Sequence, residues 1–275
     1  MMLHGPPQDS FGLTHTGKVR SVNQDQFLIA SMHKTLDIEH TSVPDAERIL
    51  SHGGTMARLL LVADGVGGSV AGERASGLAV TAVASYVGQT MKCFYNMDLE
   101  HRDDILTELA SLAQQSHEAV LSAARENAAD AGMATTLTVV HILWPRAYIV
   151  QVGDSRCYHK RGSTLTQITK DQTVAQGLLD SGHLTPEEAE QSPFGDVLSS
   201  AVGMDISPVT TKLDLEVGDT LLLCSDGLTK HLDAPHILEC LTTAGSAESA
   251  CHHLVDAALR GGGSDNITVV VSRFL

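Results

Sequence analysis

The sequence is poor in basic residues, and this shortage limits the partners that the protein can have. Its 275 residues include 18 Lys and Arg against 33 Asp and Glu, which gives a formal net charge of -15. A surface of this sign repels the phosphates of nucleic acids and of anionic membranes, so we expect neither as the main partner. Bound divalent cations would offset part of the negative charge.

Long apolar runs are also missing. No run approaches the roughly 18 residues that a membrane-spanning helix needs, and the first seven residues have neither the basic start nor the apolar centre of a signal peptide. The five cysteines, at positions 93, 157, 224, 240 and 251, form no Cys-x-x-Cys pair. We therefore expect reduced cysteines in a cytoplasmic protein that does not bind membranes.

What the chain does contain is four short stretches in which an aspartate lies beside Gly or Asn at one end of an apolar run. A single Asp-Gly pair is most often a plain turn. Four carboxylates at the ends of buried strands, however, repel one another unless cations compensate, so the set predicts one oxygen-lined site for a hard cation such as Mg²⁺ or Mn²⁺. The aspartates are Asp64, Asp154, Asp226 and Asp265.

Together with the stretch 20–27 near the start, these four stretches resemble, in order and spacing, the metal-dependent Ser/Thr protein phosphatases of the type 2C (PPM) family. The resemblance runs from about residue 11 to residue 272, and the segment 170–203 is similar to the flap of the free-standing bacterial branch. It implies an α+β fold, a four-layer α-β-β-α sandwich of two antiparallel sheets flanked by helices. It also implies hydrolysis of phosphoserine and phosphothreonine by a metal-bridging hydroxide.

The resemblance further implies a set of metal ligands. Asp64 would bridge two cations, Mn²⁺ or Mg²⁺, with the Gly65 carbonyl on the second cation and Asp226 and Asp265 on the first. Asp154, together with Asp226, resembles the pair that holds a weaker third metal in bacterial members. Alternatively, Asp154 and the arginine two residues later tie a tight turn together, and the sequence leaves both interpretations open.

Two further residues would act on the substrate side of the site. By resemblance, Arg20 holds the substrate phosphate through its planar guanidinium, and Asp25 holds a metal-bound water. Asn23 is interpreted as a residue that stabilises the turn. The chain departs from the family at Gln24, where many relatives carry Glu, and at Val66, where eukaryotic members often carry a His that is thought to protonate the leaving group.

The motifs are interleaved from end to end, so we expect a single phosphatase domain over residues 11–275, after a loose leader over residues 1–10. Residues 33–57 are polar and predict a surface excursion with a helical turn at 45–50, and residues 172–205 predict the flap. Neither segment has a readable specificity code. Deletion of residues 35–55 is expected to alter protein-substrate preference more than turnover of a small aryl phosphate.

Apolar periodicity predicts the remaining elements. A hairpin over 134–153 that turns at Pro145 is expected to be buried on both faces, and Thr185 is expected to cap a helix. One strand is predicted to begin at residue 11 and another to span 26–31. Four helices are predicted: one that contains 75–86, one that follows residue 103 or 104, and two that span 235–242 and 247–259.

The leading hypothesis is an active, monomeric phosphatase whose partner is a phosphoprotein substrate, namely a Ser/Thr kinase or the targets of that kinase. The first alternative is a phosphatase-like module that binds phosphoproteins with little turnover, which Gln24 favours. The second alternative keeps the chemistry but takes an anti-anti-sigma-type regulator as substrate. The flap-like segment favours the leading hypothesis over this last one.

Overall fold

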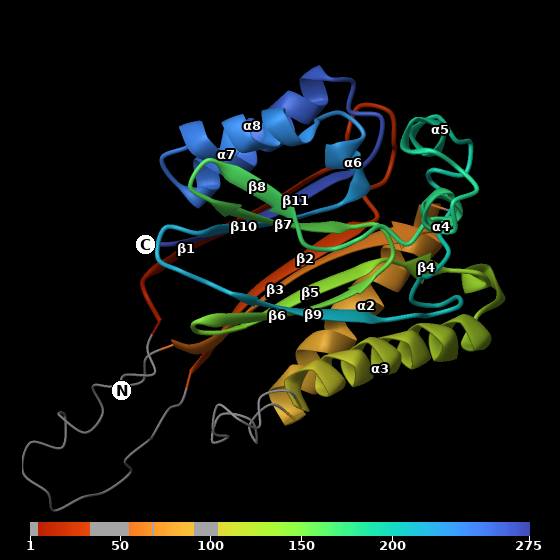
Figure 1. The fold of residues 1–275 in the computed structure, drawn as a ribbon. Coiled ribbons are helices and arrows are strands. Elements are labelled where there is room, and N and C mark those ends of the chain that lie inside the picture. Colours follow the sequence, from red (N-terminus) through yellow and green to blue (C-terminus); the bar gives the residue numbers. More distant parts are fainter. Residues whose placement is uncertain (1–4, 34–54, 68, 91–103) are drawn as a thin grey trace, which may run out of the picture.

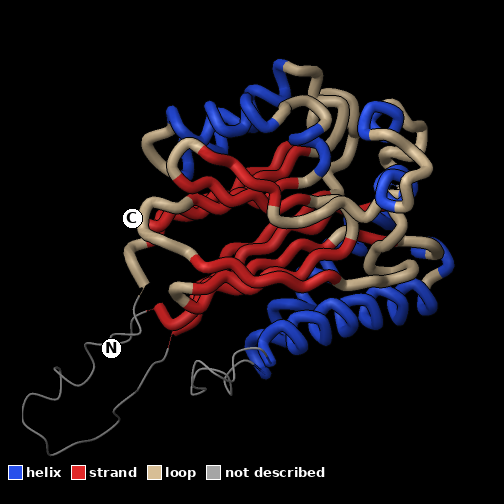
Figure 2. The backbone as a smooth tube through the Cα atoms, in the orientation of Figure 1, coloured by secondary structure: helices blue, strands red, loops and turns tan. Residues whose placement is uncertain are grey.

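The computed structural model describes residues 5–33, 55–67, 69–90 and 104–275. Two antiparallel β-sheets lie face to face, and helices cover the outer face of each sheet (Figure 1, Figure 2). The predicted four-layer α-β-β-α sandwich is confirmed. No helix in the described part of the chain is both long and apolar enough to span a membrane.

The first sheet has the strand order β1-β11-β10-β7-β8, and its neighbouring strands are antiparallel. Helices α7 and α8 cover its outer face, where α8 contacts β1 and β11 (Figure 1). The bounds are β1 Gln8–His15, β7 Arg156–Arg161, β8 Thr164–Gln167, β10 Thr220–Cys224, β11 Ile267–Phe274, α7 Ala234–Thr243 and α8 Ala247–Arg260.

The second sheet has the strand order β2-β3-β5-β6-β9, and the short β4 also pairs with β3. Helices α2 and α3 cover its outer face (Figure 1). The bounds are β2 Asp25–His33, β3 Thr55–Val66, β4 Ala134–Thr135, β5 Leu137–Leu143, β6 Arg146–Val152, β9 Val209–Asp214, α2 Ser69–Thr90, α3 Asp104–Glu126 and the 3₁₀ turn η3 Ala128–Asp130. The connection between β8 and β9 contains α4 Val174–Asp180 and α5 Pro186–Glu190, and α6 Asp226–Thr229 follows β10.

The apolar runs are continuous because the central strands are buried on both faces. In β3, Leu59 and Leu61 pack toward α2 and α3, whereas Leu60 and Val62 pack against the other sheet. In β10, Leu221 points into the space between the sheets in the same way. A strand covered on both faces needs apolar residues at every position rather than at every second one.

The predicted helices and the predicted hairpin are confirmed. The hairpin β5–β6 turns at Pro145, and all residues of β5 are buried. Helix α5 begins with the predicted cap, since the Thr185 side chain accepts a hydrogen bond from the Glu188 amide and the Glu188 carboxylate accepts one from the Thr185 amide. Such a reciprocal pair satisfies two amides that the first helical turn leaves free.

Two predicted boundaries are wrong. Strand β1 begins at Gln8, so residues 8–10 belong to the sheet and not to a leader. This edge strand is only half-buried and carries polar side chains such as Ser10, whose hydroxyl bonds to that of Ser272 at 2.7 Å. The pattern therefore lacked the apolar signal of the central strands.

The second wrong boundary concerns the excursion predicted over residues 33–57. Strand β2 extends to His33 and β3 already begins at Thr55, because the pairing of these two strands continues out to His33 and Thr55. Residues 34–54, including the helical turn predicted at 45–50, lie outside the described residues.

Candidate metal centre

The predicted acidic residues meet at one end of the sandwich, in a cavity of about 470 Å³. Its lining includes Asp64, Asp154, Asp226, Asp265 and Arg20, which come from five separate parts of the chain. The Gly65 backbone lines the same cavity. Of the site residues predicted from sequence, Asp25 alone does not line it, and it lies buried directly behind Asp64.

Strand pairing brings the first two acids together. Asp25 at the start of β2 is the register partner of Asp64, which lies within β3 and not beyond its end. The Asp64 amide donates to the Thr136 hydroxyl at 2.9 Å, and the Thr135 hydroxyl donates to the Asp64 carbonyl at 2.9 Å. The hydrogen-bonded sheet therefore fixes the position of Asp64.

Two glycines allow the remaining backbone pieces to approach. A Cβ on Gly65 would overlap the carbonyl oxygen of Gly72 in α2, and a Cβ on Gly227 would overlap that of Asn266. The second contact brings the turn that carries Asp226 against the turn that carries Asp265. Only glycine fits at such close backbone approaches, which explains why glycine follows Asp64 and Asp226.

Burial and mutual repulsion raise the pKa values of several of these acids. The pKa of Asp64 lies well above its usual value because of burial and the nearby charges of Asp25, Asp226 and Asp154. Burial, with a smaller contribution from Asp226, raises the pKa of Asp154 to about 7. Burial raises the pKa of Asp25 to about 6, although hydrogen bonds from Thr268 and Ser225 oppose the shift. A cluster of this kind favours bound cations.

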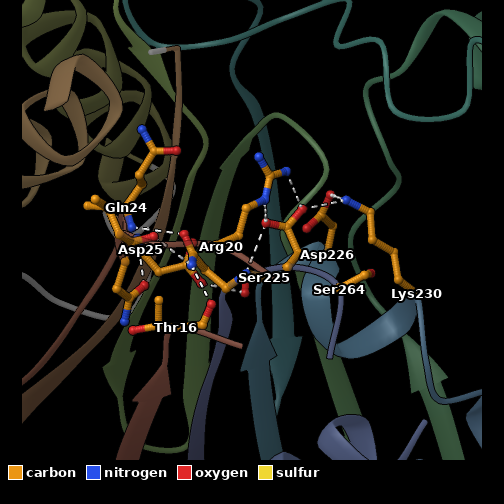
Figure 3. Close-up of polar contacts among 12 residues, drawn as sticks. Thr16, Arg20, Gln24, Asp25, Ser225, Asp226, Lys230 and Ser264 are labelled. Atoms are coloured by element: carbon orange, nitrogen blue, oxygen red, sulfur yellow. Dashed lines mark hydrogen bonds and ion pairs between the residues drawn. The ribbon is translucent and has the colours of Figure 1, made fainter. Parts of the chain in front are cut away.

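Two basic side chains contact the cluster (Figure 3). The Arg20 Nε and Nη2 atoms lie 2.8 and 3.0 Å from the two carboxylate oxygens of Asp265. The Lys230 Nζ lies 2.6 Å from Asp226 Oδ2 and 2.9 Å from Asp265 Oδ2. Burial alone would raise the pKa of Asp265, but the hydrogen bonds from Arg20 and Lys230 outweigh it and lower that pKa.

As the side chains are placed, no three His, Cys, Asp or Glu residues of the described part of the chain surround a common metal position. The donor set nevertheless fits a hard divalent cation, because it offers carboxylate and carbonyl oxygens. In addition, Asp226 Oδ1 and Asp25 Oδ1 are buried without a hydrogen-bond partner among the described residues. Such orphaned oxygens are costly unless a cation or water meets them.

The alternative in which Asp154 and Arg156 tie a tight turn together is wrong. Arg156 does not bond to Asp154; its guanidinium bonds to both oxygens of Asp171 at 2.7 to 3.1 Å. Asp154 instead lines the cavity. Asn23 has the predicted turn role, since its Oδ1 accepts from the Asp25 amide at 3.2 Å and its Nδ2 donates to Thr14 at 2.8 Å.

Three residues of the site were given no role from sequence. Ser225 donates to Asp25 Oδ2 at 2.7 Å, and Asn266 accepts from the Gln24 amide at 2.9 Å while donating to two carbonyls of the loop before β2, those of Thr16 and Val22. Lys230 is the third, and its place four residues after Asp226 was a usable signal, because that spacing brings side chains together on a helical turn.

The segment predicted as the flap lies beside this cavity. Its helices α4 and α5 stand at the same end of the sandwich as α6 (Figure 1), and its residues Asp196 and Met204 line the cavity. A second hollow of about 670 Å³ lies between the flap and the first sheet, and it shares Asp154, Asp226 and Lys230 with the cavity.

The fold and the acidic cavity together define the class: a two-sheet α-β-β-α sandwich with a candidate metal centre at one end. Comparison with known families then identifies the family. The sequence profile of the protein phosphatase 2C family matches residues 44–259. The chain therefore belongs to the protein phosphatase 2C family.

Curated relatives point to the bacterial members. The serine/threonine protein phosphatase PstP of Mycobacterium tuberculosis is 42% identical over 217 residues, which are 78% of this chain and 40% of the relative. The chain thus spans less than half of that relative's length. The protein phosphatase PhpP of Streptococcus pneumoniae is 35% identical over 215 residues, which are 78% of this chain and 84% of the relative.

Solved structures share the fold over nearly the whole chain. The crystal structure of the Mycobacterium tuberculosis phosphatase PstP/Ppp has a TM-score of 0.77 at 32% identity, covering 97% of this chain and 98% of that one. A Streptococcus agalactiae serine/threonine phosphatase has a TM-score of 0.80 at 26% identity, covering 98% and 100%. The catalytic domain of PstP, solved in complex with two manganese ions, has a TM-score of 0.74 at 32% identity, covering 97% of each chain.

Proposed function

We propose that this protein is a metal-dependent phosphatase that hydrolyses phosphoserine and phosphothreonine on proteins. The observation that carries the proposal is the meeting of Asp64, Asp154, Asp226 and Asp265 in one cavity, with Arg20 at its edge. The named activity of the bacterial relatives and the two manganese ions in the structure of PstP support it.

In this proposal, Asp64, the Gly65 carbonyl, Asp226 and Asp265 hold two cations, Mn²⁺ or Mg²⁺, and Asp154 with Asp226 holds a third. Bound divalent cations supply a water that is nucleophilic near neutral pH and neutralise charge on the phosphate. Asp25 positions this assembly from behind, because it is buried and held by Ser225.

Arg20 is proposed to bind the substrate phosphate. Its side chain is half exposed, and only Nε and Nη2 are used by Asp265, so the guanidinium keeps further donors for a second anion. Val66 lines the cavity but has no titratable group, so the proton for the leaving group has to come from a water or from another acid.

The flap is proposed to contact the protein part of the substrate. The hollow between the flap and the first sheet opens onto Asp154 and Asp226, so a peptide whose phosphoryl group lies in the cavity can extend under α4 and α5. We further propose a cytoplasmic monomer that opposes a Ser/Thr kinase, in line with the reduced cysteines, of which Cys157, Cys224 and Cys251 are buried and free.

The proposal is tested by phosphate release from a phosphothreonine peptide across a Mn²⁺ titration. Metal-dependent turnover that is lost in both Asp64→Asn and Asp226→Asn supports the hydrolase. Capture of the phosphopeptide without phosphate release by folded, metal-loaded protein would favour the binding module instead. A parallel assay with a phosphorylated anti-anti-sigma-type protein separates the two substrate classes.

A further inference from the structure

Lys230 occupies a position in the cavity that the proposed function does not explain. It directly follows α6 and its amide donates to the Asp226 carbonyl at 2.9 Å, so the backbone makes one helical turn between the two residues. This turn directs the ammonium back onto the Asp226 carboxylate (Figure 3), and Asp265, two residues before β11, supplies a second carboxylate. One cation therefore joins two of the proposed metal ligands.

The ammonium and a metal ion would use the same two carboxylates. Lys230 Nζ lies 2.6 Å from Asp226 Oδ2 and 2.9 Å from Asp265 Oδ2. A Mg²⁺ or Mn²⁺ ion bound to these carboxylates approaches its oxygens to about 2.0–2.2 Å and keeps several waters around it. An ammonium and a divalent cation on the same two carboxylates would repel each other, so a metal ion would weaken or displace the ion pairs of Lys230.

Asp265 has two basic partners, Arg20 and Lys230, and their contacts indicate that a metal ion would displace Lys230. Arg20 binds both oxygens of Asp265, and among the described residues no hydrogen bond or ion pair joins it to Asp226. Lys230 has a flexible stem, and its side chain is 26% exposed, so it can rotate without moving the backbone. Asp196 of the flap, with Oδ1 at 3.9 Å from Nζ, is a ready acceptor for the displaced ammonium.

We propose that Lys230 is a built-in counter-cation of the metal site, which stabilises the metal-free acidic cluster and competes with the first divalent cation for Asp226 and Asp265. This inference rests on the proposed metal-dependent function. Lys230 would thereby set the affinity for metal, because the free energy needed to break its ion pairs weakens metal binding. Lys230 is thus a positioning residue and not a catalytic one.

Mn²⁺ binding, measured by calorimetry in the absence of substrate, tests the proposal in the full chain. Lys230→Met keeps the stem and removes the charge, and it is expected to tighten Mn²⁺ binding about tenfold, equal to ~1.4 kcal/mol. It is also expected to lower the melting temperature of the metal-free protein, because the carboxylates lose their partner. Lys230→Arg keeps the charge and is expected to show no gain in affinity.

Lys170→Met is the matched control. Its ammonium forms an ion pair with Asp180 at 2.6 Å, but this pair is exposed and away from the cavity, so Mn²⁺ affinity should not change. Unchanged or weaker Mn²⁺ binding by Lys230→Met would overturn the proposal, while the proposed function would stand. No Mn²⁺ binding by the unmodified protein would instead overturn the proposed function together with this inference.

A second measurement follows the Lys230 ammonium itself in the unmodified protein. The ¹⁵N signal of the Lys230 ammonium, assigned by its absence in Lys230→Arg, is followed in the unmodified protein during addition of Mg²⁺. Displacement predicts that the signal shifts or loses its protection as the site fills. A signal that stays unchanged at saturating Mg²⁺ would show that the ammonium is not displaced.

Discussion

The acidic cavity and the flap lie side by side at one end of the molecule, but the chain holds them in different ways. The cavity acids and the neighbouring Asp25 are fixed by strand register and by hydrogen bonds, such as those from Ser225 to Asp25 and from the Asp64 amide to Thr136. The flap has two helices of seven and five residues, and none of the residues of α5 is buried.

Under the proposed function, this difference separates the region that carries out the chemistry from the region that recognises the substrate. Ligands of a metal must keep their geometry within fractions of an ångström, so they benefit from rigid elements and a second layer of hydrogen bonds. A surface that contacts a protein substrate gains from short exposed elements, which open at little cost in free energy. Substitutions in the cavity should therefore change turnover of every substrate, and substitutions in the flap should change protein substrates first.

The strongest test of this separation places the same substitution in both regions. Asp226→Asn removes a charge from the cluster and should lower turnover of a small aryl phosphate by about 10³-fold, a loss of several kcal/mol in transition-state stabilisation. Asp180→Asn in the flap, where the carboxylate is exposed and pairs with Lys170, should keep that turnover within a few fold. Comparable losses in steady-state assays with Mn²⁺ would mean that the flap takes part in the chemistry.

The acids in and beside the cavity should also determine how the stability of the metal-free protein depends on pH. Burial raises the pKa of Asp25 to about 6 and that of Asp154 to about 7, from an ordinary value of 3.8, so the folded protein keeps protons that the unfolded chain has lost. The stability from these protons is complete below about pH 4 and is lost as the pH rises through 6 and 7, on the order of 3 kcal/mol for Asp25.

The expected result is a melting temperature of metal-free protein that falls between pH 5 and pH 8, read by thermal unfolding after exhaustive removal of metal. Asp25→Asn should show a shallower slope, because one of the raised groups is gone. A slope as steep as that of the unmodified protein would contradict the role of Asp25. Saturating Mn²⁺ should reverse the trend, since the metal binds the deprotonated carboxylates.

A smaller effect is expected for the hydrogen bonds that support the cavity from behind. Asn266→Ala leaves the Gln24 amide and the Thr16 and Val22 carbonyls without their partner, at a cost of about 1–3 kcal/mol. The loop with Arg20 should loosen, so the KM for aryl phosphate should rise and the melting temperature should fall by several degrees. Asn266→Asp serves as comparison, because it keeps the acceptor and loses the donor.

The smallest effect is expected at the cap of α5. Thr185→Ala removes the side-chain acceptor of the Glu188 amide and should cost about 1 kcal/mol in the flap alone. Turnover of a phosphorylated protein should fall a few fold, with the aryl phosphate rate and the melting temperature unchanged. Equal loss on both substrates would break the separation between the two regions.

The sequence predicted the strands, helices and site residues where the local pattern was strong. Continuous apolar runs identified the doubly covered strands β3, β5, β6 and β10, and the Thr185 signature identified a helix cap. Prediction was weakest at the edge strand β1 and at the ends of the hairpin β2–β3, because strand pairing rather than side-chain pattern extends these elements.

Residue types at fixed spacing were sufficient to indicate that Asp64, Asp154, Asp226 and Asp265 gather in one place, and the structure brings them together in one cavity. Only the tertiary structure decided what surrounds them: the ammonium of Lys230 on Asp226 and Asp265, Ser225 on Asp25, and Asn266 on the loop before β2. The physical reason is the separation along the chain over which each interaction acts. Apolar periodicity and turn chemistry act between neighbours in the chain, whereas Lys230 and Asp265 are 35 residues apart and meet only when β11 lies beside β10.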